Sequence, residues 1–270
     1  MEKISFIGAG SMAEAIISGI VKNGLLTKER IFVTNKNNQE RLENLKECYD
    51  VQCIHDKQHV IDGAEMIILS MKPYDLEAAI NSIKDHVRPH QLVVSVVAGI
   101  STDYIVEQIG ENIPVVRVMP NTSAAVGQSA TAISKGKNAT EEQVKQVKAL
   151  FETIGTTTVV EETDMHTVTG ISGSGPAYVY YFVEAMERAA IEAGLDREVA
   201  KALITQTIIG AGEMLSNSGE SAETLRKNIT SPAGTTQAGL ETLERFDFQK
   251  IVMECVKSAR ERSKELGESK

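Results

Sequence analysis

The chain has 270 residues but no tryptophan, only three cysteines, and an aromatic content of 4%. Cys48, Cys53 and Cys255 do not show the paired spacing of zinc ligands, and an odd number of cysteines does not suit a disulfide framework. We therefore expect no metal site, and thiols that stay reduced, as in a cytosolic protein. Each cysteine is interpreted as a small core or surface residue.

An excess of basic residues is also missing, because the formal net charge is -9. Without a basic stripe to neutralise phosphates, nucleic acid is excluded as an expected partner. No apolar run is long enough to cross a bilayer, and Met1 leads into a strand without a cleavable apolar leader. The sequence thus indicates a cytoplasmic protein with no membrane partner, and its length favours two domains.

The N-terminal segment has the order strand, glycine turn, helix. The apolar run Lys3–Ile7 leads into Gly8-Ala9-Gly10, and helical apolar spacing follows. In a dinucleotide fingerprint Gly8 makes the tight turn, Gly10 lets a pyrophosphate touch the backbone, and the small Ala13 lets the helix pack on the strand. We predict a dinucleotide site here; the alternative is a glycine-rich turn without a ligand.

The second expected strand, Ile31–Thr34, ends at Asn35. Proteins that bind NAD usually carry Asp or Glu at this place for the ribose hydroxyls. Asn35 and Lys36, with Arg41 one helical turn further on, suit instead the extra phosphate of NADP. The sequence predicts that NADPH is preferred and NADH is possible, although exposed basic residues are often plain solvated charges.

Strand and helix patterns alternate as far as residue 160, and all later patterns are helical. Apolar strand runs between helices indicate a parallel sheet covered on both faces. We predict an α/β fold with an N-terminal Rossmann-type, doubly wound, mostly parallel sheet (1–162) and a C-terminal all-helical domain (163–270). The expected elements include helices at 39–47 and 74–84, strands at 66–69, 92–97, 114–118, 130–134 and 156–160, and a capping box at Thr140 and Gln143.

A second ligand segment is expected at Thr230–Leu240, which is rich in hydroxyls and small residues. Ser231 is predicted as the N-cap of a helix and Pro232 as its first residue, so that backbone amides point at an anion. An ordinary capped helix is the alternative. The run from Ser172 to Gly175 is interpreted either as a pocket wall or as a close helix crossing.

Over its whole length the chain resembles the Δ1-pyrroline-5-carboxylate reductase family. The motifs that carry this resemblance are Met71-Lys72-Pro73, Ala98-Gly99-Ile100, Arg117–Thr122, Ser172–Ala177 and Thr230–Leu240. Two positions depart from the family pattern. Ala233 replaces a commoner glycine and is expected to have a negative φ. Lys57 stands where an asparagine that contacts the cofactor is frequent.

The resemblance implies reduction of Δ1-pyrroline-5-carboxylate to L-proline, the last step of proline biosynthesis, by hydride transfer from NADPH. It implies a homodimer or higher homo-oligomer, a dimerising helical domain, and an active site that combines two subunits. The implied cofactor residues are Ile7, Gly8, Ala9, Gly10, Ser11, Met12, Asn35, Lys36, Lys57, Ser70, Met71, Lys72, Pro73, Val97, Ala98 and Gly99. The expected substrate residues are Asn228, Ser231, Gly234, Thr235 and Thr236, with Ser172 and Gly175.

Thr236 is the expected catalytic residue, through a hydrogen bond from its hydroxyl to the ring nitrogen of the substrate. A protonated imine is already electrophilic, so no acid-base side chain is required. Two alternatives differ from this prediction. A β-hydroxyacid dehydrogenase would need a lysine in the helix Gly175–Met186, which has none. A redox-sensing protein that binds NADP(H) without turnover would not need the substrate loop.

Overall fold

The computed structural model describes residues 2–268 and divides the chain into two compact units. One unit contains the residues up to Ser174 together with those from Lys257 on, and the other is Gly175–Val256. The domain boundary after residue 162 stays a prediction.

The first unit is built on one eight-stranded sheet in the order β3-β2-β1-β4-β5-β6-β7-β8. Neighbouring strands are parallel except for the antiparallel pair β6 and β7. The chain leaves β3 and crosses over β1 to start the other half at β4, which is the Rossmann arrangement that the sequence predicts. The strands are β1 Ile4–Ile7, β2 Ile31–Thr34, β3 Gln52–Cys53, β4 Met66–Leu69, β5 Leu92–Ser95, β6 Val115–Met119, β7 Ser129–Lys135 and β8 Gly155–Val159.

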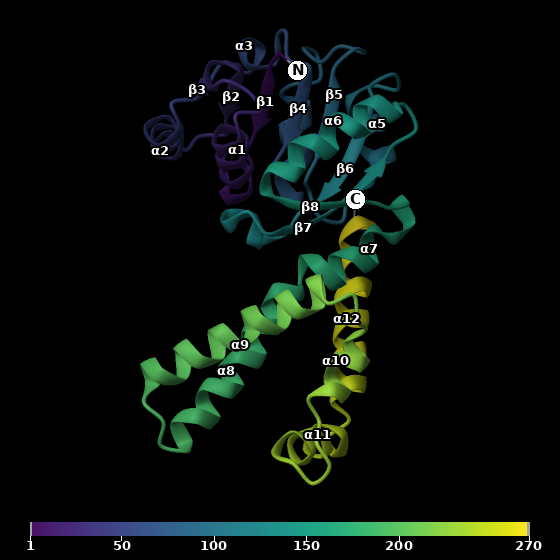
Figure 1. Cartoon of the computed structure of the whole chain (residues 1–270). Coiled ribbons are helices and arrows are strands. Elements are labelled where there is room, and N and C mark those ends of the chain that lie inside the picture. Colours follow the sequence, from purple (N-terminus) through teal and green to yellow (C-terminus); the bar gives the residue numbers. More distant parts are fainter. Residues whose placement is uncertain (1, 269–270) are drawn as a thin grey trace. The chain divides into compact units, whose positions relative to one another are not determined.

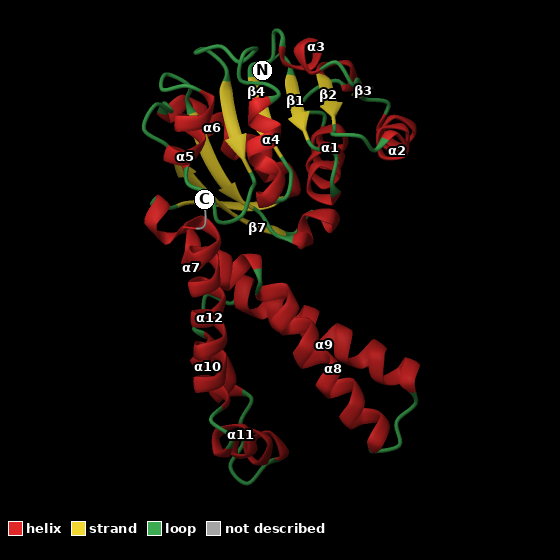
Figure 2. Cartoon of the chain, turned by 180° about the vertical axis from the view of Figure 1, so that it is seen from behind, coloured by secondary structure: helices red, strands yellow, loops and turns green. Residues whose placement is uncertain are grey.

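Two layers of helices cover the sheet (Figures 1 and 2). Successive side chains of a strand point to opposite faces. Phe6 and Ile68 therefore join a core with α1, α2 and α6, whereas Ile7 and Leu69 join a core with α3, α4 and α5. These helices are α1 Ser11–Asn23, α2 Gln39–Tyr49, α3 Lys57–Ile61, α4 Leu76–Asn81, α5 Thr102–Ile109 and α6 Glu141–Phe151, and the unit also contains α7 Met165–Val168 and the end of α12 Phe248–Glu268.

Local signals in the sequence set several element ends. The predicted capping box is present, because the Thr140 hydroxyl accepts from the Gln143 amide and the Gln143 side chain accepts from the Thr140 amide. The helix expected at 74–84 is shorter. Its start is the 3-10 turn Pro73–Asp75, and α4 runs only to Asn81. Proline fixes its own φ and offers no N–H, which suits such a turn.

The second unit is entirely helical in its described residues, as the sequence predicts. It contains α8 Gly175–Glu192, α9 Arg197–Asn217, α10 Ala222–Asn228, α11 Thr235–Arg245 and the first part of α12. Large apolar side chains are exposed along these helices, including Leu203 at 59%, Ile209 at 51% and Met253 at 71%. The helical unit of one chain therefore leaves much of its apolar surface uncovered.

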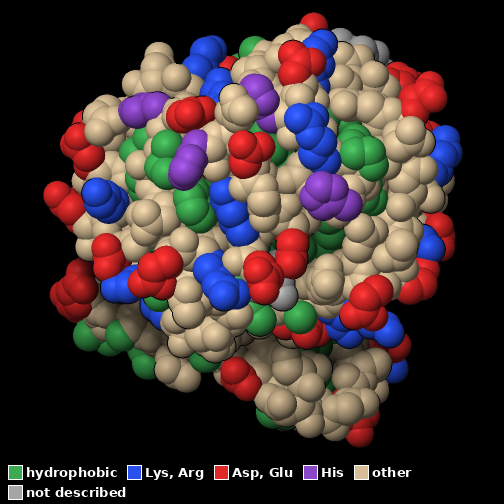
Figure 3. All heavy atoms as spheres, turned by 90° about the horizontal axis from the view of Figure 1, so that it is seen from above, with side chains coloured by type: hydrophobic (Ala, Val, Ile, Leu, Met, Phe, Trp, Pro, Cys, Tyr) green, Lys and Arg blue, Asp and Glu red, His purple; other side chains and the backbone are tan. Residues whose placement is uncertain are grey.

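Three further properties concern the surface charge, membrane-spanning helices and metal ligands. On the face seen in Figure 3, Lys and Arg side chains are interspersed with Asp and Glu. Among residues 2–268, none of the helices combines the length and the hydropathy needed to span a membrane. The same residues contain no cluster of three or more His, Cys, Asp or Glu side chains suited to a metal ion.

Candidate active site

A cavity of about 920 Å³ lies at the carboxyl ends of the parallel strands. Its walls come from the segments that follow β1, β2, β4, β5 and β6, on both sides of the point where the strand order reverses between β1 and β4. Ligands of open α/β sheets bind at this kind of switch point. Its position alone indicates a ligand site.

The glycine turn forms one wall of the cavity through two glycines with different roles. Gly8 has a φ of +113°, and a Cβ added to it would lie 2.4 Å from the Ser70 carbonyl oxygen. Gly8 therefore allows the close approach of β1 and β4 ends. Gly10 has an ordinary φ of -73°, and a Cβ there would meet nothing within 4 Å. The space beside Gly10 is left for a ligand.

The start of α1 suits an anion. Gly10 is its N-cap, and no side chain of the described residues caps the helix. The first amides of a helix have no partner within the helix, and together with the macrodipole they favour negative charge. Ser11 and Met12, at this helix start, line the cavity. A dinucleotide diphosphate fits these residues.

The Thr34 hydroxyl is a second feature that suits a ligand site. It is buried and has no hydrogen-bond partner among the residues that the structure describes. Because Thr34 lines the cavity next to Asn35 and Lys36, a polar group of a bound cofactor or a water can supply that partner. The volume, the helix start and this hydroxyl together fit a nicotinamide dinucleotide.

The segment after β2 brings one basic side chain to the cavity. Asn35 is held by two hydrogen bonds with the backbone of Asn38, of 2.7 and 3.0 Å. Lys36 lines the cavity with a side chain that is 74% exposed, and its Nζ lies 3.5 Å from a carboxylate oxygen of Asp75. The Lys36 ammonium is accessible to a phosphate.

Arg41 does not join Lys36, contrary to the sequence-based expectation. Its Nε donates to the Ala9 carbonyl at 2.7 Å, and its Nη2 pairs with Glu14. The guanidinium is thus bound to the glycine turn and to the first turn of α1. Spacing along a helix could not reveal this, because both partners belong to the preceding strand-helix unit.

Most predicted cofactor residues do line this one cavity. They are Ile7, Gly8, Ala9, Gly10, Ser11, Met12, Asn35, Lys36, Lys57, Ser70, Met71, Lys72, Pro73 and Ala98. Val97 and Gly99 lie outside this lining. Val96 and Ala98 face the cavity, whereas Val97 between them is buried in the opposite core with 1% exposure. Alternation of an extended backbone explains this difference.

Part of the lining lies outside the predicted cofactor residues. The additional residues are Ala15, Thr34, Asp75, Ala78, Ala79, Ser82, Val96, Met119, Pro120, Asn121, Thr122, Ala124, Ala125 and Gly173. The segment Met119–Thr122 could have been found, because it begins at the carboxyl end of the parallel strand β6 and therefore lies at the same edge as the glycine turn. Asn121 also donates from Nδ2 to the Ser172 carbonyl at 3.0 Å.

Ser172 and Gly175 are placed differently from each other. Ser172 lies in the π-helical turn Thr169–Gly173, with its hydroxyl donating to the Val168 carbonyl, and it is Gly173 that lines the cavity. A Cβ on Gly173 would lie 2.8 Å from Met119 Cε. Gly175 opens α8 in the helical unit. The assignment of both residues to the substrate stays a prediction.

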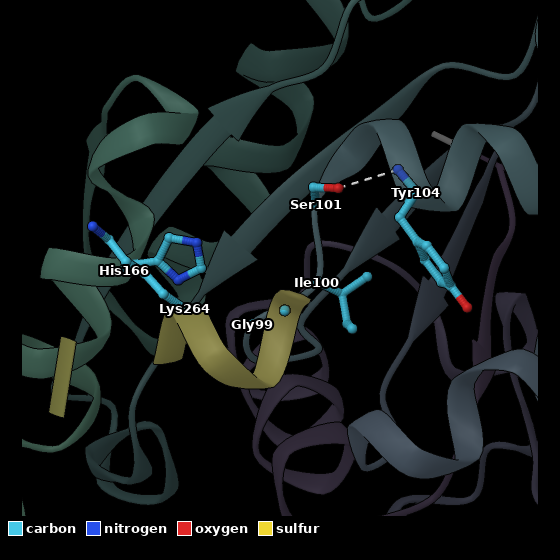
Figure 4. A pocket seen from close by; sticks show the side chains of 7 residues that line it. Gly99, Ile100, Ser101, Tyr104, His166 and Lys264 are labelled. Atoms are coloured by element: carbon cyan, nitrogen blue, oxygen red, sulfur yellow. Dashed lines mark hydrogen bonds between the residues drawn. The ribbon is translucent and has the colours of Figure 1, made fainter. Parts of the chain in front are cut away.

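Gly99 takes part in a tight contact with the end of α12. It has a φ of +81°, and a Cβ on Gly267 would lie 2.4 Å from the Gly99 carbonyl oxygen. A separate cavity of about 350 Å³ lies beside this contact, and Figure 4 shows His166 and Lys264 on one side of Gly99 and Ser101 with Tyr104 on the other. His166 Nδ1 and the Ser263 hydroxyl are 3.0 Å apart. Gly99 thus has a packing role here.

The Glu162 carboxylate is occupied by hydrogen bonds and an ion pair within the first unit. Glu162 accepts from the Thr102 amide at 2.8 Å and the Thr102 hydroxyl at 2.5 Å, and it pairs with Arg117 at 3.3 Å. Burial lowers the pKa of the Arg117 guanidinium from its ordinary value, and the nearby Glu162 carboxylate partly offsets this effect. Glu162 therefore holds the start of α5 and is not presented to the cofactor cavity.

The loop of the helical unit departs from the expected capping. α11 begins at Thr235 with Gly234 as its N-cap, so Ser231 and Pro232 are not its first residues. They belong to a turn closed by the 3.0 Å hydrogen bond from the Gly234 amide to the Ser231 carbonyl. Within the described residues no side chain caps α11. Its first amides, at Thr235 and Thr236, are donors that an anion can use.

Ala233 corrects a second expectation. Its φ is +58°, not negative. The left-handed region costs an L-residue with a Cβ roughly 1–2 kcal/mol. The Ala233 amide donates to the Gln237 side-chain oxygen at 2.8 Å, and this bond helps to hold the turn. The loop therefore keeps a glycine-like backbone even though it carries alanine.

The two glycines of the first turn give a matched prediction. Gly8→Ala must relieve both a positive φ and a backbone clash, so we expect a melting temperature lowered by several degrees, equivalent to about 2 kcal/mol or more. Gly10→Ala meets no protein atom, so we expect an unchanged melting temperature and a dissociation constant for NADP⁺ raised at least about tenfold. Calorimetric melting and binding titrations measure both effects. Unimpaired NADP⁺ binding by a folded Gly10→Ala variant would contradict the assignment of this turn.

Comparison with known proteins agrees with the fold and the cavity. Residues 162–266 match the family model for pyrroline-5-carboxylate reductase dimerisation, and residues 3–99 match that of NADP oxidoreductase, coenzyme F420-dependent. Pyrroline-5-carboxylate reductase 2 of Bacillus subtilis is 48% identical over 99% of this chain and 96% of its own length. The pyrroline-5-carboxylate reductase of Staphylococcus epidermidis is 39% identical over 98% and 97%.

Solved structures give the same result. A pyrroline-5-carboxylate reductase from Coxiella burnetii has a TM-score of 0.91 and 31% identity, covering 98% of each chain. The enzyme from Plasmodium falciparum, solved with NADP bound, has a TM-score of 0.89 and 32% identity, covering 99% of each chain. The chain belongs to the pyrroline-5-carboxylate reductase family.

Proposed function

We propose that the chain reduces Δ1-pyrroline-5-carboxylate to L-proline with NADPH, the last step of proline biosynthesis, in the cytoplasm. One observation carries the proposal beyond family membership. α1 and α11 both begin at a glycine N-cap without a side-chain cap, one in the dinucleotide cavity and one in the hydroxyl-rich loop. Each leaves backbone donors for an anion, which suits a diphosphate at Gly10 and a carboxylate at Gly234.

The chain's own residues mainly bind and orient. When bound, NADPH supplies the hydride. The Gly8–Met12 turn would hold the diphosphate, and Ser70–Pro73 with Ala98 would line the nicotinamide part of the cavity. The amides at Thr235 and Thr236 would hold the substrate carboxylate, and the Thr236 hydroxyl would hydrogen-bond to the ring nitrogen. Catalysis of this kind depends on proximity and orientation, because the protonated imine already accepts hydride.

The functional unit is proposed to be a homodimer or a larger homo-oligomer. The helical unit exposes large apolar side chains on α8, α9 and α12, and the dimerisation model matches residues 162–266. An apolar surface of this kind marks a protein interface. A second copy of the chain would cover it, and the substrate loop of one copy would complete the cofactor cavity of the other.

The activity itself is tested directly. The purified protein should oxidise NADPH when Δ1-pyrroline-5-carboxylate is added, and should form proline in equal amount, as measured by absorbance and amino-acid analysis. The control omits the imine. Binding of NADP(H) without turnover would instead support a redox sensor, and oxidation of β-hydroxy acids would support the dehydrogenase alternative, although Gly175–Met186 lacks the lysine that it needs.

Cofactor preference gives a second prediction. We expect a higher kcat/KM with NADPH than with NADH, because Lys36 lines the cavity next to Asn35, where the extra phosphate is proposed to bind, and Asn35 is not acidic. Lys36→Ala should lower kcat/KM for NADPH about tenfold and leave NADH unchanged, since a charge-assisted hydrogen bond contributes about 1.5–3 kcal/mol. Asn35→Asp should narrow or invert the preference for NADPH, because the new carboxylate would repel the extra phosphate. Steady-state kinetics with both cofactors measure this, with Lys22→Ala as a control on an exposed site. A wild-type preference for NADH would contradict the prediction.

Thr236 gives a third prediction. Thr236→Ala removes one hydroxyl but keeps the backbone amides of α11, so kcat/KM for the imine should fall by about 1.5–3 kcal/mol, or some tenfold to a hundredfold. The dissociation constant for NADP⁺ should barely change. Thr236→Ser keeps the hydroxyl and should retain much of the activity. An alanine variant with wild-type kinetics would show that the substrate nitrogen does not depend on Thr236.

A further inference from the structure

Arg41 connects the second strand-helix unit to the glycine turn. Its side chain is only 26% exposed although it stands in the first turn of α2. Nε donates to the Ala9 carbonyl at 2.7 Å, and Nη2 pairs with the Glu14 carboxylate in the first turn of α1. One guanidinium thus contacts both the turn and the helix that hold the proposed diphosphate site.

The Ala9 carbonyl lies at a sensitive place in the turn. Ala9 is 5% exposed and stands between Gly8, which has a positive φ, and Gly10, which borders the ligand space. A buried carbonyl without a donor is costly, and the peptide that carries it can rotate to find one. Rotation of this peptide would also turn the amide of Gly10. The Arg41 hydrogen bond opposes this rotation.

Glu14 adds an electrostatic reason for the contact. A carboxylate in the first turn of a helix interacts well with the macrodipole, but here it competes with an anionic ligand for the same helix start. Arg41 compensates this charge, and the Tyr49 hydroxyl donates to the other carboxylate oxygen of Glu14 at 3.3 Å. The carboxylate is therefore held on the α2 side.

The backbone of Arg41 is also held by a hydrogen bond. The Asn38 side chain caps α2 by accepting from the Arg41 amide at 2.9 Å, and Asn38 is bound in turn by Asn35. The chain of contacts runs from the β2 end through α2 to the Ala9 carbonyl. These contacts do not depend on the extra phosphate, which is the part of the cofactor that distinguishes NADPH from NADH.

We propose that Arg41 is a positioning residue that holds the Gly8–Met12 turn in its cofactor-binding form and supports NADPH and NADH equally. The proposal rests on the dinucleotide site of the proposed function. It separates the two basic residues after β2: Lys36 distinguishes the cofactors, and Arg41 keeps ready the backbone that both cofactors use.

Binding titrations of NADP⁺ and NAD⁺ to the full-length protein test this role without relying on turnover. Arg41→Ala should raise both dissociation constants by a similar factor of about ten, since one hydrogen bond to a charged group is lost. The KM values of NADPH and NADH should rise in parallel, with kcat at saturation little changed. Lys46→Ala removes the same charge from an exposed position on the same helix and should change neither constant. Lys36→Ala should affect NADP⁺ alone.

A double variant separates the effect of the hydrogen bond to the Ala9 carbonyl from the effect of net charge. Arg41→Ala combined with Glu14→Gln restores the net charge of the wild type but lacks the contact with the Ala9 carbonyl. Both dissociation constants should stay raised. Their return to wild-type values would assign the effect to charge and overturn the proposal. If Arg41→Ala lost affinity for NADP⁺ alone, or for neither cofactor, the proposal would be overturned as well.

Thermal melting shows whether the variants are folded. If Arg41→Ala does not fold, Arg41→Lys can be used, which keeps the charge but not the planar fork of donors. It should raise the dissociation constants of NADP⁺ and NAD⁺ by the same factor, smaller than that expected for Arg41→Ala. A selective loss for NADP⁺ in that variant would overturn the proposal. A wild-type protein that binds both cofactors but does not reduce Δ1-pyrroline-5-carboxylate would contradict the proposed activity and leave the role of Arg41 to be decided by the titrations.

Discussion

The close backbone approach of the Gly8 turn to the end of β4 is the constraint on which the cofactor cavity depends. Gly8 is tied to β2 by its amide hydrogen bond to the Thr34 carbonyl, and to β4 by the Ser70 hydroxyl, which donates to the Gly8 carbonyl. There is no room for a Cβ between the Gly8 backbone and Ser70. Three strand ends therefore meet at one point, and the loops that follow them open around a common space.

At two helix starts, a glycine N-cap leaves backbone donors without a side-chain cap. Several helix starts among the described residues are capped by the side chain of the N-cap residue, for example Asn38, Ser101, Thr140 and Ser221. α1 and α11 begin instead at Gly10 and Gly234. Capping side chains would compete with an anionic ligand for the same amides, so glycine at these two places keeps the amides available.

The helical unit poses a different physical problem. Its helices form readily, but one chain does not cover their apolar faces, as the exposed Leu203, Ile209 and Met253 show. Hydrophobic burial must then come from association, since an isolated helical layer with such surfaces has little stability of its own. The proposed homo-oligomer would supply this burial.

The sequence by itself determined the parts of the molecule that follow from local periodicity and local chemistry. Continuous apolar runs predicted the strands, the glycine turn predicted a ligand site at the switch point, and the Thr140 capping box predicted the start of α6. Tertiary structure decided the rest. The Arg41 guanidinium reaches partners about thirty residues earlier, Val97 turns away from the cavity, and α11 starts at Thr235 after a left-handed Ala233. Each of these depends on which distant backbone a residue meets, and no pattern within a single helix or strand contains that information.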